Sequence, residues 1–144
     1  MKIRNKLNLL VIGLIISILP VFATPNWVQI DNKKYIDTNS LRKENYSNSN
    51  YNNYYSIWVK FLNDGSKNFL DLESFYKSKI WFTSRQAYFD CKNKRVAEKS
   101  FVTYDLEGNV IENNTINDYN LSFSSIVPGT IGDIIYDYVC TGEI

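Results

Sequence analysis

The sequence predicts an α+β domain in which a single antiparallel sheet of about five or six strands is covered by helices on one face. Three observations support this fold class. Segments in which apolar and polar residues alternate recur along the chain, short polar turns separate them, and two further segments carry apolar residues at helical spacing. The chain has 144 residues, of which 44% are hydrophobic and 15% aromatic, so it is long enough to form one core.

Residues 1–23 have the three parts of a secretory signal peptide. A basic beginning is followed by an unbroken apolar stretch over residues 9–19, and Pro20 precedes small or neutral residues up to the cleavage position at Ala23. The apolar stretch is too short for a retained anchor, because a spanning helix needs about 20 residues. We therefore expect cleavage after Ala23, a single domain over residues 24–144 and no membrane span after cleavage.

The predicted signal also bears on location and partners. No cysteine follows the apolar stretch, so the signal is not of the lipoprotein type. We expect an exported protein that is periplasmic or secreted, with cell-surface association as a further option. Cleavage removes three basic side chains and leaves a slightly acidic domain, which argues against nucleic acid as a partner.

The domain is expected to begin with a short hairpin. Residues 27–30 and 35–36 have strand composition, and the Asp-Asn pair at 31–32 favours a turn between them. The polar cluster at 37–40 is expected to cap a brief helical turn over residues 41–43.

A loop, the clearest strand and a helix follow. Residues 45–53 are polar, Asn-rich and unpatterned, which predicts an exposed loop. Residues 54–62 alternate strictly, with β-branched and aromatic side chains, as a half-buried strand does. Residues 69–79 place four large apolar side chains on one side of a helix.

The next segments predict an antiparallel meander. Residues 80–90 and 95–104 are expected to be strands joined by the tight polar connection at 92–94. A turn over residues 105–109 then leads into a returning strand that begins at residues 110–111.

The last element is predicted to be a helix. Thr130 follows a Pro-Gly break and can cap it, Asp133 suits its first turn, and Gly142 can end it. One continuous apolar stripe is expected along this helix, formed by Ile131, Ile134, Ile135, Tyr138 and Val139.

Cys91 and Cys140 are the two cysteines of the chain. An even number in an exported protein favours a disulfide, which would attach the last helix to the strand that ends at Cys91. A metal-binding pair and a reactive thiol are the alternatives. Two thiolates without histidine are too few for a closed zinc site, and the spacing is not CxxC, so we favour the disulfide.

The composition excludes several kinds of chemistry. The chain has no histidine, which rules out Ser-His-Asp and Cys-His catalysis and His-ligated zinc. Its six glycines do not form a phosphate-binding loop, and no spacing brings two acids together for glycoside hydrolysis. We expect no enzymatic activity, no cofactor and no metal. Ser84 and Arg85 are interpreted as ordinary surface positions, and Lys60 as a solvated side chain.

The aromatic content suggests a binding surface, since the chain has 11 Tyr, 8 Phe and 3 Trp. Tyr54 and Trp58 lie on the second face of the strand at 54–62, and Tyr46 and Tyr51 lie in the adjoining loop. Tyr and Asn together are favoured in protein-binding surfaces, so these four residues are a candidate surface. The alternative is that Trp58 packs under a helix and the tyrosines cover the sheet. That alternative is preferred for Trp58, and both readings stay open for the loop tyrosines.

Motifs spread over residues 27–140 resemble the surface-adhesin E family of small exported bacterial proteins. The set, in chain order, is Trp27, Tyr35-Ile36-Asp37 with Ser40-Leu41, Ile57-Trp58-Val59-Lys60, Asp90-Cys91 with Arg95, Tyr104-Asp105 with Gly108, Val127-Pro128 and Tyr138-Val139-Cys140. Each motif is weak alone, and their order makes the resemblance more specific.

The resemblance implies a small antiparallel sheet with a C-terminal helix, a disulfide between the two cysteines and a tendency to form homodimers. It also implies adhesion, the binding of host extracellular-matrix or serum proteins, without catalysis. This chain departs from the adhesin in lacking a lipid-attachment cysteine. The sequence thus predicts a non-enzymatic exported binding protein with a protein partner. The alternative is a periplasmic accessory or inhibitor protein that docks on an envelope enzyme or complex.

Overall fold

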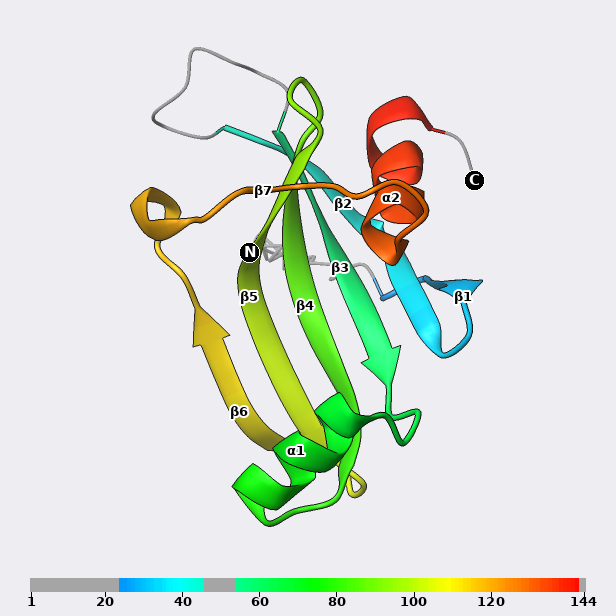
Figure 1. Cartoon of the computed structure of the whole chain (residues 1–144), viewed down its shortest axis with the longest axis vertical. Helices are drawn as coiled ribbons and strands as arrows, with labels where there is room; N and C mark the ends of the chain where they lie inside the picture. The colour runs from blue at the N-terminus through cyan, green and yellow to red at the C-terminus, as the bar shows by residue number, and fades with distance from the viewer. Residues whose placement is uncertain (1–23, 46–53, 143–144) are drawn as a thin grey trace, which may run out of the picture.

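The computed structural model describes residues 24–45 and 54–142. The predicted signal peptide and most of the predicted Asn-rich loop, with Tyr46 and Tyr51, lie outside these residues. Figure 1 shows one twisted sheet with two helices in front of it. The fold is therefore the α+β arrangement that the sequence predicts, with a disulfide-linked C-terminal helix.

The sheet is an antiparallel meander in which each of the first six strands pairs with the next one along the chain. The strands are β1 (Trp27–Asp31), β2 (Lys34–Glu44), β3 (Tyr54–Leu62), β4 (Ile80–Asp90), β5 (Arg95–Asp105) and β6 (Val110–Thr115). A two-residue strand, β7 (Ser124–Ser125), pairs with the first residues of β5. Strands β3 and β4 have the bounds predicted from alternation, because short polar turns end both of them.

The predicted helical turn at residues 41–43 is wrong, because β2 continues to Glu44. Arg42, Lys43 and Glu44 pair with β3, which gives their backbone groups hydrogen-bond partners along a ladder. The polar residues expected to cap a helix instead lie at a register shift in β2, between Asp37 and Arg42. The Ser40 hydroxyl donates to the Asp37 carbonyl oxygen at 2.6 Å and accepts from the Trp58 N–H at 2.9 Å.

Both helices lie on the same face of the sheet. Helix α1 (Lys67–Tyr76) crosses one end of the sheet, and α2 (Ile131–Tyr136) lies over the other end (Figure 1). Helix α1 begins two residues earlier than predicted and ends earlier as well, because Lys77 adopts a left-handed conformation with φ 52°. A 3₁₀ turn, η1 (Asp118–Asn120), lies between β6 and β7.

The C-terminal helix differs in detail from the prediction. After α2 the chain continues as one π-helical turn, η2 (Asp137–Thr141), and Gly142 ends it in a left-handed conformation with φ 77°. Thr130 makes no capping bond through its side chain, and the Asp133 carboxylate accepts from the Gly129 N–H instead. The predicted apolar stripe is narrower than expected, because Ile134 is 40% exposed.

The core lies between the helix-bearing face and the C-terminal helix. Its buried members are Ile36, Ile57, Val59, Phe89, Ile126, Ile135 and Val139. Beside it, Cys91 and Cys140 form the predicted disulfide, with Cα atoms 5.5 Å apart. The Tyr136 hydroxyl also donates to the Cys91 carbonyl oxygen at 3.0 Å. The C-terminal helix is thus held by apolar packing, a covalent bond and a hydrogen bond.

Asp90 should make the stability of the protein pH-dependent. Its side chain is buried, and its carboxylate accepts from Arg95 at 2.6 Å and from Asn93 at 2.8 Å. Burial raises the pKa of this carboxyl, but these hydrogen bonds outweigh it, and the pKa lies below its ordinary value. A pKa lowered by folding stabilises the protein above the unfolded-state pKa, and the contribution disappears as pH falls through the folded-state value.

We expect wild type to exceed Asp90→Asn in unfolding free energy by about 1.5–3 kcal/mol at pH 7, the usual range for hydrogen bonds to charged groups. The difference should shrink below about pH 4, where the unfolded carboxyl takes up a proton. Urea unfolding of both proteins at several pH values measures it. A difference that stays constant with pH would contradict the assignment.

Candidate functional site

The sheet has a second face, opposite the helices, which is rich in aromatic side chains. Side chains of directly paired residues in neighbouring strands share a face. By this register, Tyr35, Lys60, Ser84 and Val102 form one row, and Asp37, Trp58 and Gln86 form the next. We call this surface the open face; it carries Trp27, Tyr35, Trp58, Lys60, Phe82 and Tyr104, all partly exposed.

Lys60 lies at the centre of an aromatic cluster on the open face. Its Nζ is 4.2 Å from the ring centre of Trp27, 5.1 Å from that of Tyr35 and 5.8 Å from that of Phe82. Such distances allow cation–π attraction. Partial burial lowers the pKa of the Lys60 ammonium, and the Asp37 carboxylate opposes this effect. Lys60 is therefore packed among rings, and its interpretation as a solvated side chain is wrong.

A pocket of about 380 Å³ opens beside this cluster. Its lining residues come from the segment before β1 and from the five strands β1 to β5. They are Pro25, Trp27, Asp37, Trp58, Ser84, Val102 and Tyr104. The Asp37 carboxylate is held in place by the backbone, since its Oδ1 accepts from the N–H groups of Asn26 at 2.8 Å and of Asn39 at 3.1 Å. The pocket thus combines aromatic walls with a fixed carboxylate.

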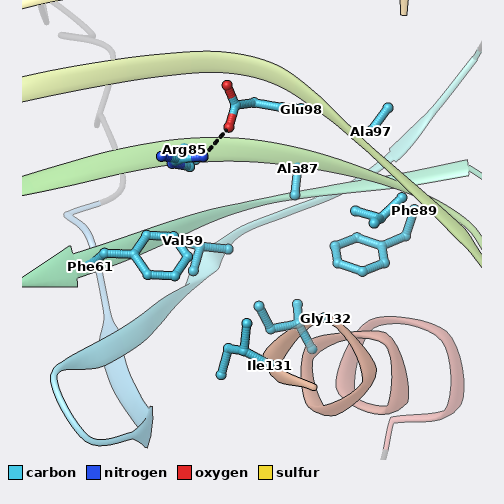
Figure 2. A pocket seen from close by; sticks show the side chains of 11 residues that line it. Val59, Phe61, Arg85, Ala87, Phe89, Ala97, Glu98, Ile131 and Gly132 are labelled. Carbon is cyan, nitrogen blue, oxygen red and sulfur yellow. Dashed lines mark hydrogen bonds and ion pairs between the residues drawn. The ribbon is translucent and has the colours of Figure 1, made fainter. Parts of the chain in front are cut away.

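A second pocket, of about 220 Å³, lies on the helix-bearing face. Figure 2 shows the side chains of Val59, Phe61 and Phe89 between the sheet and the helix that carries Ile131. Its lining is almost entirely apolar, and the ion pair between Arg85 Nη1 and Glu98 Oε2, 2.8 Å long, lies at its margin. This pocket is continuous with the core, and it offers few polar groups to orient a ligand.

Of the four residues predicted to form a binding surface, the structure places one at the open-face pocket and one in the interior. Trp58 is on the open face and lines the pocket there, so it does not pack beneath a helix. Tyr54 is only 5% exposed, and its ring lies 5.5 Å from that of Phe123, so it belongs to the interior. The positions of Tyr46 and Tyr51 fall outside the described residues.

Of the seven residues that line the open-face pocket, sequence reasoning chose only Trp58 as a site residue. Ser84 is only 7% exposed, so its interpretation as a surface position is wrong. Trp27 and Tyr104 line the same pocket from other strands. Extending the alternation of β3 across its neighbours could have found Ser84, because Ser84 pairs directly with Lys60. Strand register was the missing information.

Residues 24–45 and 54–142 contain neither a candidate metal site nor a helix that could span a membrane. No group of three or more acidic or cysteine side chains in these ranges could hold a metal ion. The helices found there are also too short or too polar to cross a membrane.

These features define a small, disulfide-bonded α+β domain with helices on one face of a meander and an aromatic opposite face. Residues 27–141 match the family model of surface-adhesin protein E. The chain belongs to the surface-adhesin protein E family. Family membership implies an exported protein with a binding role, and the family is generally non-enzymatic.

Solved structures show the same fold. Crystal form II of Haemophilus influenzae protein E superimposes with a TM-score of 0.55 at 11% identity, covering 85% of this chain and 93% of that chain. A further structure of Haemophilus influenzae protein E gives a TM-score of 0.54 at 12% identity, covering 85% and 89%. None of the curated proteins compared with the sequence matches it.

Proposed function

We propose that this protein is a non-enzymatic adhesin-like module that is periplasmic, secreted or displayed at the cell surface, and that it binds a host extracellular-matrix or serum protein through its open face. The observation that carries the proposal is the partly exposed aromatic cluster around Lys60 and Trp58. Trp and Tyr are enriched among the residues that dominate protein–protein affinity, and here a rigid sheet positions them.

The sheet suits a binding role because one face forms the core and the other face leaves its aromatic side chains partly exposed. The helix-bearing face packs Ile57, Val59 and Phe89 against the C-terminal helix, so the core does not depend on the other face. Aromatic side chains on the open face can therefore remain accessible without loss of the core. Strand pairing fixes their spacing, which reduces the ordering cost when a partner binds.

Replacing Trp58 with alanine should weaken binding to the protein partner about tenfold or more, as expected for loss of an aromatic anchor. The test uses protein recovered after export and a panel of immobilised matrix and serum proteins, with binding measured by surface plasmon resonance. Phe75→Ala is the matched control, because Phe75 is 77% exposed on α1, across the sheet from the open face.

Two outcomes would contradict the proposal. The first is the absence of binding, across the panel, above that of reduced and unfolded protein. The second is equal loss of binding in Trp58→Ala and Phe75→Ala. Capture of one stoichiometric bacterial envelope protein, with no binding to host proteins, would instead favour the accessory or inhibitor function. Thermal unfolding of both variants establishes that each is folded during the measurement.

A further inference from the structure

We propose that the open-face pocket is a saccharide-binding site that takes a neutral pyranose unit of a glycan. The inference rests on the proposed function, because it makes the carbohydrate of a host glycoprotein the group that the open face recognises. The pocket volume of about 380 Å³ lies within the usual range for small-ligand sites.

The first argument comes from buried polar atoms without partners. Ser84 is only 7% exposed, yet within the described residues its hydroxyl makes no hydrogen bond. The hydroxyl oxygen is not fully enclosed by protein atoms, and Ser84 lines the pocket, so the hydroxyl is accessible from the pocket. A buried hydroxyl normally has a partner, and its absence here points to a ligand or solvent group.

The Asp37 carboxylate also has an oxygen without a hydrogen-bond partner, and this group is charged. The residue is 8% exposed, and both of its hydrogen bonds use Oδ1, which leaves Oδ2 without a protein donor among the described residues. Oδ2 is also not fully enclosed. A carboxylate oxygen held in this way is a strong acceptor for a ligand hydroxyl, because charge-assisted hydrogen bonds are shorter and stronger than neutral ones.

The aromatic walls complete the chemistry. Trp27, Trp58 and Tyr104 line the pocket, and within the described residues their indole N–H and phenol O–H groups have no hydrogen-bond partner. A pyranose ring has C–H groups on its faces, which suit the negative face of an aromatic ring, and hydroxyls at its edge, which both donate and accept. Rings, donors and acceptors are thus present in the combination that a sugar requires.

Charge favours a neutral sugar over an anionic one. The pocket contains the Asp37 carboxylate, which would repel a carboxylated, sulfated or phosphorylated ligand. The Lys60 ammonium is near enough to interact with Asp37, but it lies over the Trp27 ring and is not among the pocket-lining residues. The acceptor that faces the ligand is therefore negative, and hydroxyl donors satisfy it best.

The test measures binding of protein recovered after export to an array of neutral and sialylated oligosaccharides, followed by titration with the best free sugar. We expect binding to neutral glycans, with affinity reduced about fivefold or more by Ser84→Ala and about tenfold or more by Asp37→Asn. Ser84→Ala removes no protein hydrogen bond, so it should fold normally. Ser74→Ala, at an exposed position on α1, is the matched control and should bind like wild type.

The same variants separate this inference from the proposed function. If the panel protein still binds after enzymatic deglycosylation and the array shows no binding, the saccharide site is overturned and the protein-binding function stands. If the array binds and no panel protein does, the saccharide site stands and the protein-binding function fails. Equal sugar binding by wild type and Ser84→Ala, or a preference for sialylated glycans, would also overturn the saccharide site as assigned here.

Discussion

Replacing Cys91 and Cys140 together with serine should lower the free energy of unfolding by about 4 kcal/mol. The bond closes a loop with a sequence separation of 49, and in the chain-entropy model a cross-link of that span removes about this much conformational freedom from the unfolded chain. Urea unfolding followed by tryptophan fluorescence measures the change, because all three tryptophans lie in or beside the sheet.

Reduction of the wild-type protein provides the control for this prediction. A reducing agent should lower the stability of wild type to that of the double serine variant, and it should leave the variant unchanged. If reduction leaves the unfolding midpoint of wild type where it was, the bond does not stabilise the native state. The native protein should also contain no free thiol by mass spectrometry after alkylation.

Replacing Phe89 with alanine should cost about 3–5 kcal/mol, the range found when a large buried aromatic side chain is truncated. Phe89 is 1% exposed and belongs to the core that joins β3 and β4 to the C-terminal helix. Truncation would enlarge the pocket that Phe89 already lines, and the surrounding strands cannot collapse into it without losing their pairing. Urea unfolding at neutral pH measures the loss.

Phe75→Ala makes the same chemical change at a site that is 77% exposed, and it should alter stability by about 0.5 kcal/mol or less. The comparison isolates burial, because both variants lose the same atoms. A similar loss in the two variants would mean that the core does not lie between the sheet and the C-terminal helix.

The contrast between the two faces of the sheet explains how a small domain can combine stability with binding. The helix-bearing face places its side chains in a core that the disulfide reinforces. The open face keeps Trp58, Ser84 and Asp37 at a pocket, with polar atoms that have no hydrogen-bond partner among residues 24–45 and 54–142. If the open face binds as proposed, stability and recognition depend on different residues of the same strands, so single substitutions should separate them.

Much of the fold follows from local pattern. The strand bounds of β3 and β4 and the helical character of α1 were predictable, because alternation, helical spacing and turn residues act over a few neighbouring positions. The disulfide was predictable because an exported chain with two cysteines has one internal pairing. The turn predicted at residues 41–43 failed because pairing with β3 overrode the local preference of a polar cluster.

The sequence by itself determined where most of the strands and helices lie, that the cysteines pair, and that catalysis by histidine is absent. The tertiary structure decided which side chains meet. Asp37, Trp58, Ser84 and Tyr104 come from four different strands, and strand register alone brings them to one pocket. The reason is physical: alternation assigns each residue to a face of its own strand, whereas neighbours across strands depend on hydrogen-bond register and bulges, which involve residues far apart in the chain.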